Sequence, residues 1–154
     1  MRTARSEIDV LAAYDAGQRD FRQWNLAGAD LSFVVLRSVD FSDASMPGVR
    51  LRGADLQGTL FVRADLTRAD LSEINLSDGS LVQAILWQAD LSGARLEGVD
   101  ASGADFSGAH LRGARLDQTL LEGARLEDAD IANTDVSAAT VQRKPLVPAP
   151  AYEY

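Results

Sequence analysis

Cysteine is absent from this chain of 154 residues, and histidine occurs only once. Without cysteine there are no disulfide bonds, thiolate zinc sites or cysteine nucleophiles. A single histidine does not suffice for a histidine-based metal site or for a multi-histidine active site. We therefore expect no metal ion, no cofactor and no catalytic residue.

Long apolar runs are missing as well. No stretch reaches the 18 apolar residues of a membrane span, and the charged N-terminus lacks an apolar segment of signal length. The net charge of −8 argues against direct binding to nucleic acid or to an anionic membrane. The expected protein is cytoplasmic and has no contact with a membrane.

What the chain does contain is a repeat with a period of five. From Phe21 to Val141, every fifth residue is apolar, in all 25 positions. The positions around this apolar residue are selective as well. Two residues before it, 14 of 24 positions are Ala, and one residue before it, 12 of 24 are Asp or Asn. Two residues after it, 10 of 24 positions are Gly. The consensus unit is therefore Ala-(Asp/Asn)-Leu-X-Gly, and residues 54–58 and 89–93 match it at every position.

Neither a helix nor a simple strand explains this spacing. Apolar residues recur at about 3.6 in a helix and at 2 in a strand. Within one unit, however, Ala and Leu are two residues apart, so a short extended piece places both on one side. The Gly and Asp/Asn columns supply turns. Four such sides close a square coil of 20 residues, and successive coils stack as parallel strands about 4.8 Å apart.

The pattern resembles the pentapeptide repeat family, and the resemblance covers about four-fifths of the chain. It implies an all-β fold, a right-handed quadrilateral parallel β-helix. We expect about six coils over residues 21–143. Residues 1–20 form an N-terminal segment, and residues 144–154 form an irregular, proline-containing tail with Pro145, Pro148 and Pro150.

A short helix is predicted over residues 6–16, lying as a cap on the first coil. Ser6 is the expected N-cap, Asp9 its capping-box partner and Gly17 the stop signal. An apolar stripe of Ile8 and Leu11, extended by Ala12, is expected to face the coil.

The many carboxylates invite a catalytic interpretation, which the repeat opposes. Aspartates recur in one slot, directly before the large apolar residue, and a solvent-facing turn role explains them all. Nine of them are Asp30, Asp55, Asp65, Asp70, Asp90, Asp100, Asp105, Asp130 and Asp135. Catalytic carboxylates need unlike environments that separate their pKa values. A repetitive wet surface does not offer them.

Apolar residues in slots that face water are the better functional signal. They are Phe33, Val35, Leu60, Val62, Val82, Ile85, Trp87 and Leu120. Five of these are expected to form one patch on the middle coils: Leu60, Val62, Val82, Ile85 and Trp87. A clustered patch with a Trp at its edge is typical of an interface. An idle surface or a locally widened core is the alternative.

The sequence thus favours a non-enzymatic interaction or scaffold module that binds a protein partner or a second copy of the chain. The alternative is a DNA mimic that inhibits or protects DNA gyrase, as some members of the family do. Against it, the charge is spread evenly, at −2 on each of the four sides. Duplex DNA carries one charge per about 1.7 Å, far more than any side of this rod.

Overall fold

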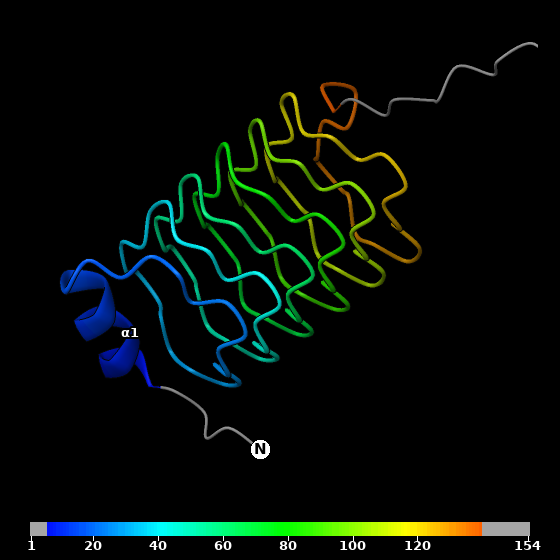
Figure 1. The fold of residues 1–154 in the computed structure, drawn as a ribbon. Coiled ribbons are helices and arrows are strands. Elements are labelled where there is room, and N and C mark those ends of the chain that lie inside the picture. Colours follow the sequence, from blue (N-terminus) through cyan, green and yellow to red (C-terminus); the bar gives the residue numbers. More distant parts are fainter. Residues whose placement is uncertain (1–5, 140–154) are drawn as a thin grey trace, which may run out of the picture.

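A computed structural model describes residues 6–139 of the chain. Figure 1 shows a rod of stacked, four-sided coils with the single helix of this described part, α1 (Glu7–Asp15), at one end. The predictions for residues 144–154 lie outside the described residues. Within residues 6–139, no helix is long and apolar enough to cross a lipid bilayer.

Helix α1 lies within one residue of its predicted bounds, 6–16, at each end. Ser6 is the N-cap: the Asp9 amide donates to its hydroxyl at 3.4 Å, and the Ser6 amide donates to the Asp9 carboxylate at 2.8 Å. This reciprocal pair is the predicted capping box. After the helix, Gly17 takes a positive φ of 92°, which stops further helical growth.

The face that α1 turns toward the rod differs from the prediction. Val10 is the fully buried residue of the helix, and Leu11, Ala13 and Tyr14 pack partly against the core. Ile8 is 77% exposed, so its predicted place in the apolar stripe is wrong. The predicted stripe rests on residue spacing alone, whereas packing against the first coil determines which face of α1 is buried.

Each five-residue unit is one short side followed by one tight turn. In most units the carbonyl of the large apolar residue accepts a hydrogen bond from the amide three residues later, as the Leu51 carbonyl does from the Ala54 amide at 2.9 Å. The residue before that donor has a positive φ at every unit from 23 to 133, as the third position of a type II turn requires. Thirteen of these 23 residues are not glycine, for example Gln83 at φ 56°.

The coils are in strict 20-residue register. Parallel bridges join residues 20 positions apart, from Asp20 with Asp40 through His110 with Asp130. The amide of the apolar residue donates to a carbonyl 19 residues ahead, as from Leu66 to Ile85 at 2.8 Å. Each side is therefore held by backbone hydrogen bonds to the coils above and below it.

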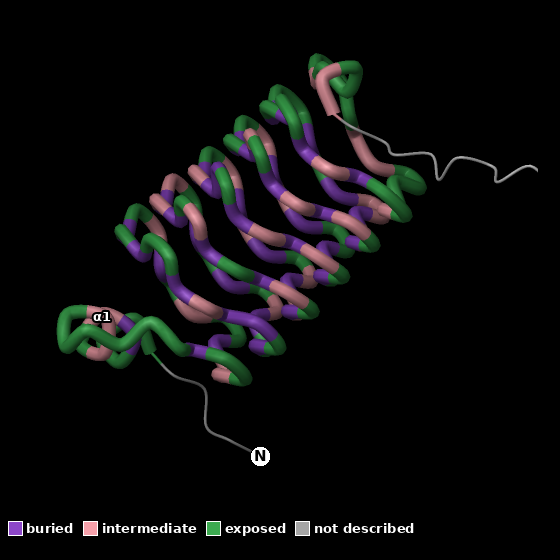
Figure 2. Tube along the Cα trace, turned by 45° about the horizontal axis from the view of Figure 1, so that its top comes forward, coloured by how far each residue is buried: buried purple, intermediate pink, exposed green. Residues whose placement is uncertain are grey.

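The leucine column forms the axis of the rod. From Phe21 to Leu121, no member of this column is more than 8% exposed, and the Ala column beside it is buried from Val34 to Thr119. Figure 2 shows the resulting alternation of buried and exposed residues around the coils between the two ends of the rod. Near α1 the core is aromatic: the ring centroids of Phe21 and Phe41 lie 5.3 Å apart, and those of Phe41 and Phe61 lie 5.5 Å apart.

Candidate functional site

Side chains next to a buried leucine point outward, because neighbours along an extended segment alternate between its two faces. Leu60 and Val62 flank buried Phe61 in this way. Leu60 is 39% exposed and Val62 is half-buried. Val82, one coil further on, is half-buried as well. These three predicted residues share one side of the rod.

Val62 and Val82 are backbone neighbours on that side. The Asp43 amide donates to the Val62 carbonyl and the Arg63 amide to the Val82 carbonyl, both at 2.9 Å, so the two valines occupy equivalent places in adjacent coils. In the column of Leu60, the bridged residues are Asp40 and Ser80. Along the rod, the apolar surface on this side therefore extends over two coils at the valines and over one coil at Leu60.

Ile85 and Trp87 lie on the next side, where they flank buried Leu86. They are 44% and 40% exposed. The bridged neighbours of Ile85 are Asp65 and Asp105, so this apolar group is confined to one coil. The structure thus places the five predicted residues in two groups on adjacent sides of the middle coils.

A cation borders the tryptophan. The guanidinium carbon of Arg68 lies 5.2 Å from the centroid of the Trp87 ring, within the range of a cation–π interaction. The Arg68 Nε also donates to the Gln88 side-chain oxygen at 3.0 Å. These contacts hold Arg68 beside the ring, so the rim of the apolar group carries a positive charge.

The first coils expose two further apolar side chains that the predicted patch did not include. Phe33 is 70% exposed and Val35 is 55% exposed, both more than any residue of the patch. Phe33 adopts a positive φ of 61°, and its ring lies over Gly53, where a Cβ would be 2.7 Å from the ring. Their outward slots signalled this exposure in the sequence, but their exposed fractions follow only from the structure.

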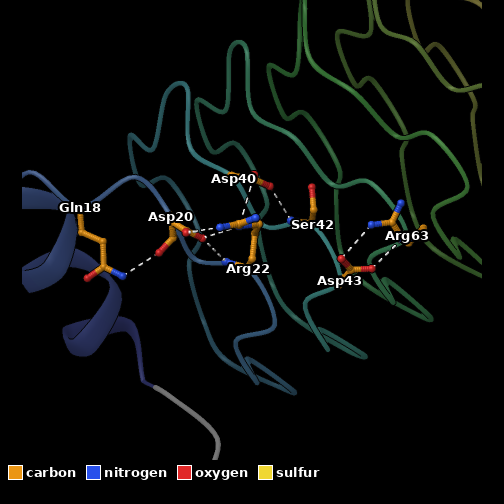
Figure 3. A network of polar contacts seen from close by, with 7 residues as sticks. All are labelled: Gln18, Asp20, Arg22, Asp40, Ser42, Asp43 and Arg63. Carbon is orange, nitrogen blue, oxygen red and sulfur yellow. Dashed lines mark hydrogen bonds and ion pairs between the residues drawn. The ribbon is translucent and has the colours of Figure 1, made fainter.

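Near α1 the surface is polar, and Figure 3 shows its network. Arg22 binds Asp20 through two hydrogen bonds of 2.9 and 2.7 Å and approaches Asp40 at 3.9 Å. Arg63 binds Asp43 through two more, at 2.7 and 2.9 Å. An open cleft of about 310 Å³ lies beside this network, and Leu60 of the patch forms part of its wall.

Two carboxylates of the network, Asp20 and Asp43, are already paired with arginines. The side-chain hydrogen bond from Arg22 lowers the pKa of Asp20 to about 2, and the one from Arg63 lowers the pKa of Asp43. A general acid needs a carboxyl whose pKa is raised toward neutrality. This arrangement does the opposite, and it stabilises the surface rather than supplying a proton donor.

The turn role predicted for the nine aspartates is confirmed. In each, one carboxylate oxygen accepts a hydrogen bond from the backbone amide two residues ahead, as Asp105 does from Ser107 at 2.9 Å. Seven of the nine are half-buried rather than fully exposed. Among residues 6–139, no three His, Cys, Asp or Glu side chains are grouped as a metal ion would require.

Arginines interrupt the acidic columns by direct pairing. Arg50 lies 3.1 Å from Asp30 in the adjacent coil, and the Nε of Arg37 donates to Asp55 at 2.8 Å. Arg115 lies 3.0 Å from Glu97. At these positions arginines interrupt the negative charge, which is continuous along a nucleic-acid backbone.

Comparison with known proteins gives one family and a set of similar structures. The family model for pentapeptide repeats matches eight copies, over residues 20–53, 44–81, 69–108 and 104–143. A search of curated protein sequences finds no significant match.

Three solved structures illustrate the likeness. The pentapeptide repeat protein Rfr23 from the cyanobacterium Cyanothece 51142 is 23% identical, with a TM-score of 0.62 over 87% of this chain and 98% of its own. The pentapeptide repeat protein alr5209 from Nostoc Pcc 7120 is 29% identical, with a TM-score of 0.55 over 92% and 100%. QnrB1, a plasmid-mediated fluoroquinolone resistance protein, is 22% identical, with a TM-score of 0.55 over 80% and 78%.

Proposed function

The chain belongs to the pentapeptide repeat family, whose fold is the right-handed quadrilateral β-helix, and from this premise we propose that it is a non-enzymatic protein-interaction module. In this proposal the rod is a rigid scaffold, and its middle coils present an apolar patch to a protein partner. The patch consists of Leu60, Val62, Val82, Ile85 and Trp87.

The single observation that carries the proposal is the placement of large apolar side chains in outward slots. In this family of coils the slots on either side of the leucine face water, and most of them here hold Asp, Ser, Arg or Gln. Leu60, Ile85 and Trp87 each expose about two-fifths of their surface. An exposed tryptophan beside aliphatic neighbours is the composition of an interface centre rather than of an ordinary surface.

The rigidity of the scaffold supports the same function. The backbone ladder fixes every column at one residue per coil, so the patch has a defined shape before a partner arrives. Binding then costs little ordering of the backbone. We further propose that residues 1–20 end the rod on one side, with α1 as its cap, that residues 21–143 form the repeat, and that residues 144–154 are a separate tail.

The experiment compares patch variants with a matched surface variant. Val62→Lys combined with Trp87→Ser removes the apolar character of both sides, whereas Ser92→Lys adds the same charge at an equivalent slot on another side. The tagged full-length proteins are used to capture partners from the native host. The proposal expects a protein that is retained by wild type and Ser92→Lys and lost by the double variant, with weak dependence on salt.

Equal capture by all three proteins would contradict the patch. The mass of each protein in solution is measured in parallel, so that a second copy of the chain is recognised as the partner if only the double variant changes mass. Circular dichroism of the three proteins verifies that each is folded.

The alternative function, action on DNA gyrase as a DNA mimic, rests on the fold that the chain shares with QnrB1. The arginine pairs described above weigh against it, because they neutralise carboxylates that a mimic needs. A supercoiling assay with titrated protein separates the two functions. Inhibition of gyrase, or protection from a quinolone, at stoichiometric protein would establish the alternative and overturn the patch as the main site.

A further inference from the structure

The two ends of the described rod differ in how well the core is covered. At the end near α1, Val10 of the helix and Phe21 and Leu26 of the first coil are all fully buried. At the other end the leucine column continues, but Leu126, Ile131 and Val136 are 37%, 42% and 42% exposed. The last part of the rod in Figure 2 is accordingly drawn as mostly exposed and intermediate residues.

Within residues 6–139, no further coil lies above these three core side chains. They occupy the inward slot of their units, and their equivalents one coil earlier, Phe106, Leu111 and Leu116, are at most 4% exposed. The exposed apolar area is therefore an end face of the rod, which we call the open end, defined by Leu126, Ile131 and Val136. An exposed, contiguous apolar face of this kind normally contacts something.

The chain itself supplies a segment with the right composition and reach. Fifteen residues follow Ala139, and ten of them are apolar or proline. One side of the coil is five residues, about 16 Å when extended, so the eleven residues from Lys144 onward span about 36 Å. That is enough to cross the end of a square coil and turn back.

Charge favours the same occupant. From Glu122 to Ala139 the last coil carries five carboxylates against one arginine, Arg125. Arg143 and Lys144 are the first charged residues after it. Arg143, the last residue of the repeat, and Lys144, the first of the tail, are thus opposite in charge to the acidic last coil, and the residues that follow are mostly apolar, like the open end.

The prolines suit a segment that ends a parallel ladder. Pro145, Pro148 and Pro150 have no amide to donate, so a chain containing them does not offer a complete edge for the addition of another strand. A cover with this composition would bury the open end without extending the rod.

We propose that residues 144–154 cover the open end of their own chain, with Leu146, Val147 and the tyrosines Tyr152 and Tyr154 packed over Leu126, Ile131 and Val136. The segment then prevents two rods from associating end to end, so protein partners bind only to the sides of the rod. This inference is independent of the patch on the middle coils.

The first experiment places charge in the tail of the full-length protein. Leu146→Asp combined with Val147→Asp introduces two carboxylates at the proposed contact, and Ala149→Asp with Ala151→Asp is the matched control of equal charge in the same segment. Hydrogen exchange of the amides of residues 121–139 is measured by mass spectrometry. The proposal expects at least a tenfold loss of protection in the first variant and little change in the control. Equal protection in all three proteins overturns the proposal.

The second experiment identifies which chain provides the cover. Because the natural chain has no cysteine, Val147→Cys with Ile131→Cys can be oxidised without competing thiols. The control pairs Val147→Cys with Ser42→Cys, which lies in a coil near the opposite end. A disulfide within one chain, formed only by the first pair, supports the proposal. A disulfide between two chains shows that a second copy covers the open end, and no disulfide shows that the tail does not reach it; either result overturns the inference.

Discussion

Gly79 gives the sharpest test of the packing, because sequence and structure predict opposite effects for its replacement by alanine. It stands in the column two residues before the leucine, where 14 of 24 positions are already Ala. By the repeat alone, Gly79→Ala restores the consensus. In the structure, however, a Cβ at this position would lie 2.6 Å from the Thr59 carbonyl oxygen and 2.7 Å from a Leu76 methyl carbon.

The sign of the effect follows from two opposing contributions. The backbone of Gly79 is not in the left-handed region, so alanine would gain about 0.4–1 kcal/mol by restricting the unfolded chain. Against this, the new methyl group crowds Thr59 and the Leu76 carbonyl oxygen, 2.9 Å away. Backbone atoms cannot rotate aside, and overpacking of this kind costs about 1–3 kcal/mol. We expect a net loss of about 1–2 kcal/mol.

Urea unfolding followed by the fluorescence of Trp24 and Trp87 measures this loss, with the slope of the transition compared between variants. Gly113→Ala is the matched control: nothing lies within 4 Å of its Cβ, but its φ is +69°. Its expected cost is about 1 kcal/mol, from the left-handed backbone alone, and Gly113→Asn should recover part of it. A midpoint for Gly79→Ala at or above that of wild type would refute the reasoning.

Three further predictions concern the core and the charges. Leu66→Asp places a carboxylate at a fully buried mid-rod position and should cost more than about 3 kcal/mol; an unchanged melting temperature would contradict the buried leucine axis. Ala101→Leu enlarges a fully buried residue and should lower the free energy of unfolding by about 1–3 kcal/mol through overpacking. The same thermal melt measures this effect, and an unchanged stability would reveal unfilled space beside Ala101. The hydrogen bond from Arg22 lowers the pKa of Asp20 to about 2, below the value of about 3.9 in an unfolded chain. The stabilisation from this carboxylate is therefore complete above about pH 4 and is lost as the pH falls toward 2. Thermal melts at pH 7, 4 and 2 should show a modest fall of the melting temperature between pH 4 and pH 2, and a smaller fall in Asp20→Asn. Equal falls of the melting temperature in both proteins would show that Asp20 does not contribute.

The candidate patch shows what the sequence could predict of a surface. The outward slots of Leu60, Val62 and Trp87 follow from a period of two around each buried residue, and the structure places all three on the outside. Their exposed fractions did not follow, because these depend on neighbours about 20 residues away. The position of Arg68 beside Trp87 was missed for the same reason.

Helix α1 shows the same division on a smaller scale. Its start at Ser6, with Asp9 as capping partner, is a matter of hydrogen bonds within four residues and was predicted correctly. Its buried face is set by contact with the first coil, and there the sequence pattern pointed to Ile8 while the structure buries Val10.

The sequence by itself determined the coil: a turn every five residues, leucine and alanine inside, and columns of residues 20 apart. These features rest on turn chemistry and on side-chain alternation, which act within a single unit. Only the tertiary structure decided that thirteen residues other than glycine between positions 23 and 133 adopt a positive φ. It also decided that Arg37 pairs with Asp55, 18 residues away, and that Leu126, Ile131 and Val136 are exposed while equivalent slots in earlier coils are buried. The reason is that stacking between coils imposes backbone conformation, ion pairing and burial, and a residue's neighbours in the stack are distant in the chain.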